Sequence, residues 1–379
     1  MSSSPTRVLI AGGGVAGLES LLALQALAGE RVEIELLAPE RHFTPRPLAV
    51  AEPFRADSLQ RLPLAAIAED RGVTLHRDAI AALLPGERAV ETQGGARLEY
   101  DALVLALGAR PVEALRGSLT FRGPQDAARV ATVVGRLRDG AIRRVAFVVP
   151  TGTAWTLPIY ELALQTAAAM RADAPGADLM LVTSEPRPLA AFGDASGAAV
   201  DALLAQHGIA LRTATDVELY ADGRLWFGLG SLEVDAVIAL PGLLGPHLRG
   251  APSDLLGFVP VDAFTRVRGL CSVHAVGDAA AHTLKQGGLA AQQAGVAAAV
   301  IAAGAGADLW PRPYRPLLHG MLLTGGEPLH LRHDPAGALE GSEELLCGPP
   351  GKIAGRHLAA YLAQHLELAA PRTLVATAR

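Results

Sequence analysis

Aromatic residues and cysteines are scarce in this chain of 379 residues. Phenylalanine, tryptophan and tyrosine together make up 4% of it, and Cys271 and Cys347 are its two cysteines. Two cysteines are too few for the disulfide framework of a small secreted protein. We interpret both as buried structural thiols, with a redox pair between them as the alternative. Because half of the residues are hydrophobic, mainly Ala, Leu and Val, we expect two or three globular domains rather than extended disorder.

A surplus of positive charge and a long apolar run are also missing. The formal net charge is −5 and no long run of Lys or Arg occurs, so there is no electrostatic reason to propose a nucleic-acid partner. The longest run of apolar or glycine residues, 294–307, is about 14 residues, below the roughly 20 needed to span a bilayer. No transmembrane helix is therefore predicted. The start, MSSSPTRVLIAGGG, lacks the pattern of a signal peptide, and we predict a cytoplasmic protein.

A glycine-rich turn between a strand and a helix stands near the start. The segment RVLIA reads as a short buried strand, GGGVAG follows, and LESLLALQALAG has a helical pattern. Gly12 permits the tight turn, Gly14 lets the backbone approach a pyrophosphate, and Gly17 lets the helix pack close to the strand. Val15 and Ala16 open the helix, whose free N–H groups attract phosphate. We predict a dinucleotide site here; a mere glycine turn is the alternative.

A carboxylate that binds the adenosine ribose is expected at the end of the second strand, residues 32–40. Ala38 occupies the usual position. We favour Glu40, just beyond it, over Glu35 inside the strand, and assign the adjoining Arg41 to the same site. The alternative for Glu40 is a solvated loop carboxylate.

Two later strand ends are further candidates for the cofactor site. The apolar strand in YDALVLALGARP ends near Ala106 and Gly108, and the one in VHAVGDAA ends in Gly277 and Asp278 before an Ala-rich helix. A carboxylate in such a place can accept hydrogen bonds from a ribityl hydroxyl or hold a water on a phosphate. We predict that all four residues lie beside the cofactor.

Together these motifs resemble the pyridine nucleotide-disulfide oxidoreductase superfamily over roughly residues 5 to 300. The resemblance implies an α/β fold with two Rossmann-like dinucleotide-binding domains of the three-layer ββα type, the second inserted in the first, and a small C-terminal α+β domain. It implies FAD as the cofactor, with its pyrophosphate on the three glycines. The implied limits are 1–110 and 261–310 for the FAD-binding domain, 111–260 for the second nucleotide-binding domain and 311–379 for the C-terminal domain.

Two segments look like the quinone-reducing branches of that family, the sulfide:quinone reductases and the type II NADH dehydrogenases. In those branches a helix like the one in LKQGGLAAQQAG points its N-terminus at the flavin, and a stretch like HFTPRPLAV passes across it. The resemblance implies Lys285 as a catalytic residue, and a surface lysine is the alternative. For the stretch HFTPRPLAV the alternative is a proline-stiffened turn. The implied flavin contacts are Thr44, Pro45, Arg46, Gly288 and Leu289.

The strand and helix of the first unit are repeated in RVAFVVPTGTAWTLPIYELAL, with one glycine in the loop instead of three. Pro150 and Gly152 would take the places of the first two glycines and Trp155 that of the third, so tight pyrophosphate binding in the usual mode is not expected. The sulfide:quinone reductase branch has a redox cysteine in this loop, where the chain has Thr151 and Thr153.

Glu161 follows in the helix of this second unit. The family has a glutamate facing the flavin or nicotinamide near this position, so the resemblance implies that Glu161 is catalytic and relays a proton to flavin N5. A helix-surface or capping carboxylate is the alternative.

The tail after residue 310 predicts two strands, in HGMLLTG and EPLHLRH, and a final helix over about 352–368. In relatives a small C-terminal domain contributes to a dimer interface or to the quinone channel, and we expect a homodimer. One face of the helix is expected to pack on the protein or a second subunit, or to lie on a membrane surface. Its residues are Ile353, Leu358, Tyr361, Leu362 and His365. The tail histidines lack metal-like spacing, and no metal site is predicted.

The sequence therefore predicts an FAD-dependent oxidoreductase that passes two electrons through flavin N5 from an unidentified reductant to an acceptor, by resemblance a quinone. One alternative is an NAD(P)H dehydrogenase in which Glu185 still holds a ribose; another is a non-catalytic FAD-binding subunit. The predicted location is the cytoplasm, with peripheral attachment to the inner face of the membrane as a further alternative.

Overall fold

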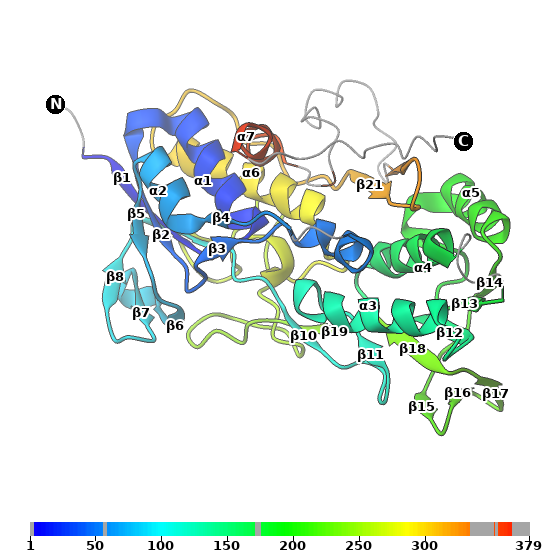
Figure 1. Cartoon of the computed structure of the whole chain (residues 1–379). Helices are drawn as coiled ribbons and strands as arrows, with labels where there is room; N and C mark the ends of the chain where they lie inside the picture. The colour runs from blue at the N-terminus through cyan, green and yellow to red at the C-terminus, as the bar shows by residue number, and fades with distance from the viewer. Residues whose placement is uncertain (1–3, 56–58, 171–175, 334–351, 353–354, 366–379) are drawn as a thin grey trace.

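The structure, a computed structural model, describes residues 4–55, 59–170, 176–333, 352 and 355–365. Its two largest sheets each have five strands, and each belongs to a separate α/β unit (Figure 1).

The first parallel sheet has the strand order β20-β9-β1-β2-β5. Alternate side chains of β1 point to opposite faces: Val8 and Ile10 pack with the helices α1 and α6, whereas Leu9 and Ala11 pack with the three-stranded sheet β6-β7-β8. This is the predicted ββα layering. The bounds are β1 Thr6–Ala11, α1 Val15–Ala28, β2 Val32–Leu37, β5 Thr74–His76, β6 Ile80–Leu84, β7 Ala89–Thr92, β8 Arg97–Glu99, β9 Ala102–Leu105, β20 Val273–Ala275 and α6 Gly287–Gly304.

The second parallel sheet has the order β11-β18-β12-β13-β14 and repeats these layers. Phe147 of β12 packs with the helices α3, α4 and α5, and its neighbours Ala146 and Val148 pack with the sheet β15-β16-β17. The predicted duplication is confirmed. The bounds are β11 Leu119–Thr120, α3 Pro124–Arg138, β12 Arg144–Val149, α4 Leu157–Met170, β13 Asp178–Thr183, α5 Gly193–Gln206, β14 Ile209–Arg212, β15 Leu219–Ala221, β16 Arg224–Phe227, β17 Gly230–Glu233 and β18 Ala236–Ala239.

Two antiparallel strands connect the units: the chain leaves the first through β10 (Arg110–Val112) and returns through β19 (Gly242–Leu244). The second unit is thus inserted in the first, as predicted. Leu248 and Val259, within the limits predicted for the second domain, pack beneath the first sheet. The domain limits themselves stay a prediction.

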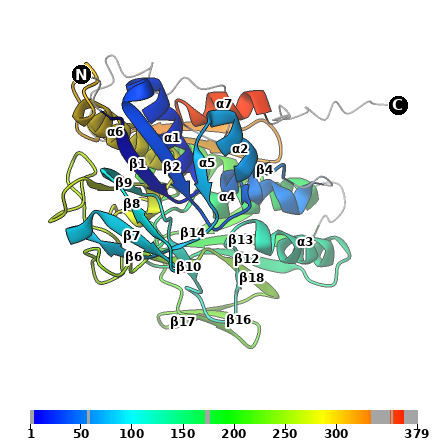
Figure 2. The same ribbon diagram turned by 90° about the vertical axis from the view of Figure 1, so that its left-hand side faces the viewer.

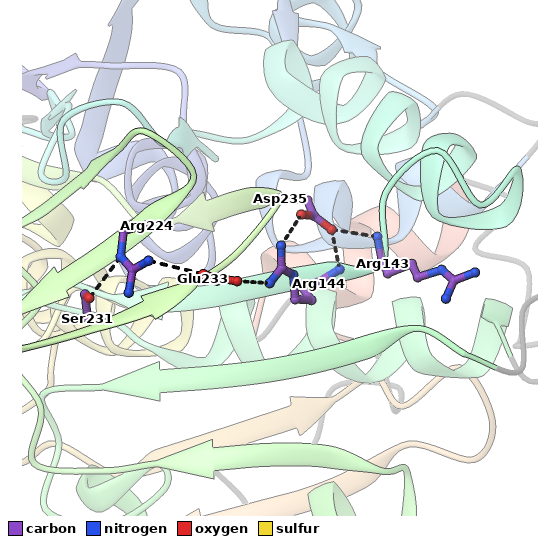
Figure 3. A network of polar contacts seen from close by, with 6 residues as sticks. All are labelled: Arg143, Arg144, Arg224, Ser231, Glu233 and Asp235. Carbon is purple, nitrogen blue, oxygen red and sulfur yellow. Dashed lines mark hydrogen bonds and ion pairs between the residues drawn. The ribbon is translucent and has the colours of Figure 1, made fainter.

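A polar network ties the small sheet of the second unit to the start of β12 (Figure 3). The guanidinium of Arg144 donates to Glu233 at 2.7 Å and to Asp235 at 3.0 Å, and Arg224 donates to the same Glu233 at 3.2 Å. Asp235 also accepts from the backbone N–H groups of Arg143 and Arg144, and these bonds lower its pKa to about 2. Because these charges are exposed and screened by solvent, the network contributes little to the stability of the fold. It lies at the opposite end of β12 from the loop that leads to α4.

The C-terminal segment forms the predicted hairpin, β21 (Leu318–Leu322) with β22 (Leu329–His333). The last helix, α7 (Leu358–His365), begins later than predicted and lies beside α1 (Figure 2). Its apolar side chains Leu358, Tyr361 and Leu362 are buried in the same cluster as α1. They pack within this chain, as expected for this face of the helix, so these three side chains are not available to a membrane surface. Ile353 and residues 366–368 lie outside the described residues.

Among the helices that the structure describes, α6 is long and apolar enough to cross a membrane by length and composition. The sequence prediction counted only the apolar run 294–307, whereas α6 begins earlier, at Gly287. In the fold α6 packs on α1, and Ala290, Ala297 and Ile301 are buried between them. It is a core helix of the first unit.

The remaining elements are short. They are β3 (His42–Phe43), which pairs with β4 (Leu62–Pro63), α2 (Leu64–Arg71) and the 3₁₀ helices η1 (Gly29–Arg31), η2 (Arg46–Phe54), η3 (Pro85–Glu87), η4 (Ala190–Phe192) and η5 (Gly277–Ala279).

Candidate functional site

A cavity of about 760 Å³ lies where both units and the C-terminal segment meet. Most of the predicted site residues line it. They are Gly12, Gly14, Val15, Ala16, Glu40, Thr44, Arg46, Ala106, Gly108, Glu161, Gly277, Asp278, Lys285 and Gly288. Four predicted residues, Gly17, Arg41, Pro45 and Leu289, do not line it, and their cofactor contacts stay a prediction.

The glycine turn after β1 has no room for side chains at two positions. A Cβ on Gly12 would lie 2.2 Å from the carbonyl oxygen of Ala106, and Gly12 has a φ of 122°. A Cβ on Gly17 would lie 1.8 Å from the carbonyl oxygen of Gly12. Gly14 differs, because no atom of the described residues lies within 4 Å of an added Cβ and none of their side chains caps the helix that begins there. An open helix N-terminus with a close backbone fits the pyrophosphate of FAD.

The second cofactor motif, Gly277–Asp278, is held from behind. The N–H of Gly277 donates to Oε1 of Gln293 at 2.7 Å, which fixes the turn against α6. The carboxylate of Asp278 accepts no hydrogen bond from any residue of the described part of the chain. Burial raises the pKa of Asp278, and the positive charges of Lys285 and Arg46 oppose that rise. A carboxylate without a partner in a cavity fits the hydroxyls of a ribityl chain.

Lys285 is 6% exposed, so the alternative of a surface lysine is wrong. Its Nζ donates to the main-chain oxygens of Asp278, at 3.2 Å, and Ala280, and lies 3.8 Å from the ring centroid of Phe258. Burial lowers the pKa of Lys285 to about 8, against the opposing charges of Asp278 and Asp254. These contacts fix the Gly277–Asp278 turn; the catalytic role stays a prediction.

The titration of Lys285 should be measurable in the stability of the protein. Below about pH 8 Lys285 is protonated in both the folded and the unfolded chain. Between that value and its ordinary pKa the unfolded chain binds more protons, so the contribution of Lys285 to stability rises with pH. We expect the free energy of unfolding of the native chain minus that of Lys285→Met to increase over this range in denaturant titrations. A flat difference would contradict the lowered pKa.

Glu40 lies in the cavity wall, whereas Glu35 is bonded to His76 and does not line the cavity. This is consistent with the preference for Glu40, and its binding to a ribose stays a prediction.

Glu161 of α4 is 0% exposed, so the alternative of a helix-surface carboxylate is wrong. Its Oε1 accepts from the N–H of Leu323 at 2.9 Å and from Nζ of Lys352, while its Oε2 has no partner among the described residues. The side chain of Lys352 is 7% exposed. Burial raises the pKa of Glu161 and lowers that of Lys352, and each charge counteracts the shift of the other. A proton can therefore be held by either group within the cavity wall.

Lys352 is a further residue of the cavity wall, outside the set predicted from the sequence, although the sequence contains a signal for it. The 33 basic residues are Lys285, Lys352 and 31 arginines, and both lysines line the cavity. Arg keeps its proton at any ordinary pH, whereas a buried Lys can lose it. Both lysines of the chain therefore line the cavity, where burial lowers the pKa of each.

The loop that replaces the glycines in the second unit is longer than the sequence comparison assumed. Residues 12–14 separate β1 from α1, but residues 150–156 separate β12 from α4. The equivalence of Trp155 with Gly17 is therefore wrong, because Trp155 precedes the helix. Its ring lies 5.7 Å from that of Phe192 and lines the cavity, as does Thr153. The hydroxyl of Thr151 instead donates to Asp216 at 2.6 Å.

Glu185, the candidate ribose carboxylate of the second unit, is satisfied by its own chain. It accepts from the hydroxyls of Tyr160 at 2.8 Å, Thr183 at 3.0 Å and Thr156 at 3.1 Å, and from the N–H of Ala190 at 3.1 Å. A nucleotide at this place would have to break these bonds.

Cys271 is exposed, so the prediction of a buried thiol is wrong. It stands in the turn before β20, where its neighbour Ser272 has a φ of 59°. Cys347 lies outside the described residues.

Comparisons with known proteins agree with this architecture. A family model described as pyridine nucleotide-disulphide oxidoreductase matches residues 6–306. The NADH dehydrogenase-like protein Rv1812c of Mycobacterium tuberculosis (strain ATCC 25618 / H37Rv) is 28% identical over 301 residues, 73% of this chain and 73% of that protein. The sulfide:quinone oxidoreductase of the hyperthermophilic bacterium Aquifex aeolicus has a TM-score of 0.80 at 19% identity, over 95% of this chain and 89% of that one. A ferredoxin reductase from Rhodopseudomonas palustris has a TM-score of 0.68 at 21% identity, over 88% and 83%.

At these identities the solved structures establish the fold, and the family model, which spans most of the chain, establishes the family. The chain belongs to the pyridine nucleotide-disulphide oxidoreductase family and is an FAD-dependent oxidoreductase.

Proposed function

We propose that this oxidoreductase reduces a quinone with electrons from a donor other than NAD(P)H. The observation that carries the proposal is the buried ion pair of Glu161 and Lys352, in the wall of the cavity that Gly14 and Asp278 also line. Bound FAD supplies two-electron transfer through N5. Residues of the chain would hold the FAD. The N-terminus of α1 would bind its pyrophosphate, and Asp278 would bind its ribityl chain.

The chemistry of a quinone suits these groups. A quinone takes up two protons with two electrons, so a buried site that reduces it needs a group that can give a proton. Glu161 has an oxygen without a partner among the residues that the structure describes, and Lys352 lies beside it. Apolar side chains of the same cavity, among them Trp155, Leu157 and Met321, suit a flat hydrophobic acceptor. The N-terminus of α6 at Gly287 and Gly288 stabilises negative charge in the cavity.

The second unit supports a donor other than a nicotinamide nucleotide. Glu185 is bonded to its own chain, and the loop 150–156 lacks the glycine turn that a pyrophosphate needs. The names of the mycobacterial relatives favour the second candidate, an NADH-dependent dehydrogenase. No cysteine stands in this loop, so a donor that needs a persulfide there is not proposed.

Anaerobic mixing of the FAD-loaded protein with candidate donors tests the proposal. We expect NADH and NADPH to leave the flavin absorbance unchanged, and another small reductant that needs no loop cysteine to bleach it. A photoreduced sample should then be reoxidised by a short-chain ubiquinone. Bleaching by NADH at ordinary turnover rates would support the second candidate. Stoichiometric FAD that no donor bleaches and no quinone reoxidises would leave a non-catalytic FAD-binding subunit.

The homodimer and the cytoplasmic location also stay proposals. Peripheral attachment to a membrane would suit a quinone acceptor, but since α1 covers the apolar side of α7, any such contact would have to use another surface.

A further inference from the structure

A second glutamate is buried at a position that corresponds to Glu161. Glu19 is the fifth residue of α1, counted from Val15, and Glu161 is the fifth residue of α4, counted from Leu157. Glu19 is 2% exposed. Both carboxylates contact the C-terminal segment of the chain, although they belong to different copies of the duplicated unit.

The partners of Glu19 are backbone groups at the start of α7. The N–H of Leu358 donates to its Oε2 at 2.7 Å and the N–H of His357 to its Oε1 at 3.1 Å. Gly355 lies so close that an added Cβ would be 2.7 Å from the same Oε2. Burial raises the pKa of Glu19, and these backbone N–H groups counteract that rise by donating to the carboxylate. A carboxylate at a helix N-terminus is also favoured by the helix dipole.

This anchor is close in sequence to the cavity. Lys352, which pairs with Glu161, precedes His357 by five residues, a length that spans at most about 18 Å when fully extended. A linker of this length limits how far the start of α7 can shift on α1 while the ammonium of Lys352 stays on Glu161. The C-terminal segment bridges the two units through two equivalent carboxylates.

We propose that Glu19 is a positioning residue, whose carboxylate anchors the C-terminal segment on α1 so that Lys352 reaches Glu161 in the cavity wall. The expected effect of Glu19 on quinone reduction rests on the proposed function, in which Glu161 and Lys352 supply a proton. The anchoring of the C-terminal segment by Glu19 does not rest on it. Glu19 touches neither the cavity nor Lys352 itself; it acts through the backbone at His357 and Leu358.

The two lysines of the chain make the anchor measurable. We expect a brief pulse of acetic anhydride on the FAD-loaded protein to label Lys352 slowly, because it is buried and paired. In Glu19→Gln, where an amide N–H₂ replaces one acceptor, we expect labelling of Lys352 to rise about tenfold through local opening, with Lys285 of the same molecule as the internal reference. Gly355→Ala should do the same without a change of charge. Ser20→Ala, which removes a buried hydroxyl bonded to Ala16 on the same helix, is the matched control and should leave labelling unchanged.

A second measurement links the anchor to the reaction. Reoxidation of the photoreduced protein by a short-chain ubiquinone should be slower in Glu19→Gln at saturating quinone, with little change in the half-saturating concentration. In a Lys352→Met background the same substitution should have no further effect.

Native-like labelling of Lys352 in folded Glu19→Gln and Gly355→Ala would overturn the inference, as would an equal slowing of reoxidation in the Lys352→Met background. If Lys352→Met itself is reoxidised at the native rate, the proposed proton role fails, and the labelling result still decides the anchor.

Discussion

Replacing Lys352 by methionine is expected to slow quinone reduction by about 100-fold or more while FAD stays bound, the usual size of a lost acid-base group. The substitution leaves the carboxylate of Glu161 buried without its cation. Because the charged form is then less favourable, the pKa of Glu161, already raised by burial, rises further and the carboxyl stays protonated at higher pH. The measurement is the rate at which a short-chain ubiquinone reoxidises the photoreduced protein, followed against pH.

A set of variants separates proton transfer from charge alone. Lys352→Arg keeps the positive charge but cannot release a proton. We therefore expect this variant to keep most of the free energy of unfolding but to reduce the quinone much more slowly than the native protein. Lys352→Met should also lower the free energy of unfolding, by about 3–5 kcal/mol if Glu161 stays ionised and less if it takes up a proton. The double variant with Lys352→Met and Glu161→Gln should regain the free energy of unfolding but should still reduce the quinone slowly. Native rates in Lys352→Arg would show that charge alone is sufficient.

The site residues that could be predicted from the sequence are those that lie close together along the chain. Gly12, Gly14 and Gly17 can be predicted because turn, phosphate contact and helix packing need glycine at fixed spacing. Asp278 can be predicted because it stands three residues beyond the end of a buried strand, before a helix. In both cases a local backbone geometry dictates the residue type, so a short segment contains the necessary information.

The rest of the site depends on contacts between distant segments. Lys352 and Glu161 are 191 positions apart, and only the docking of the C-terminal segment brings them together. The partners of Glu19 are backbone N–H groups, which have no signature in the sequence. Trp155 was misplaced because the length of the loop before α4 depends on where that helix begins, and residue spacing alone does not determine it.

The largest structural effect is expected for Gly17→Ala, because the new methyl group would lie 1.8 Å from the carbonyl oxygen of Gly12. No side chain can rotate away to relieve this clash, since both atoms are fixed by the contact of α1 with β1. Overpacking of this kind typically costs about 1–3 kcal/mol and more where the backbone itself must move. We expect a clear drop in the free energy of unfolding of the apoprotein and, with it, loss of FAD. Thermal unfolding and the flavin content of the purified protein measure both.

Gly14→Ala is the matched variant that separates the fold from the cofactor. An alanine at this position meets no atom within 4 Å, and the φ of −85° suits any residue. We expect the free energy of unfolding of the apoprotein to be unchanged. The affinity for FAD should fall by about tenfold to 100-fold, because a methyl group then stands where the pyrophosphate approaches. Each factor of ten corresponds to about 1.4 kcal/mol of binding free energy. Titration of the apoprotein with FAD gives the affinity. Native affinity in Gly14→Ala would mean that the pyrophosphate does not approach the backbone here, while low stability of the apoprotein would mean that Gly14, like Gly17, is needed for packing rather than for the cofactor.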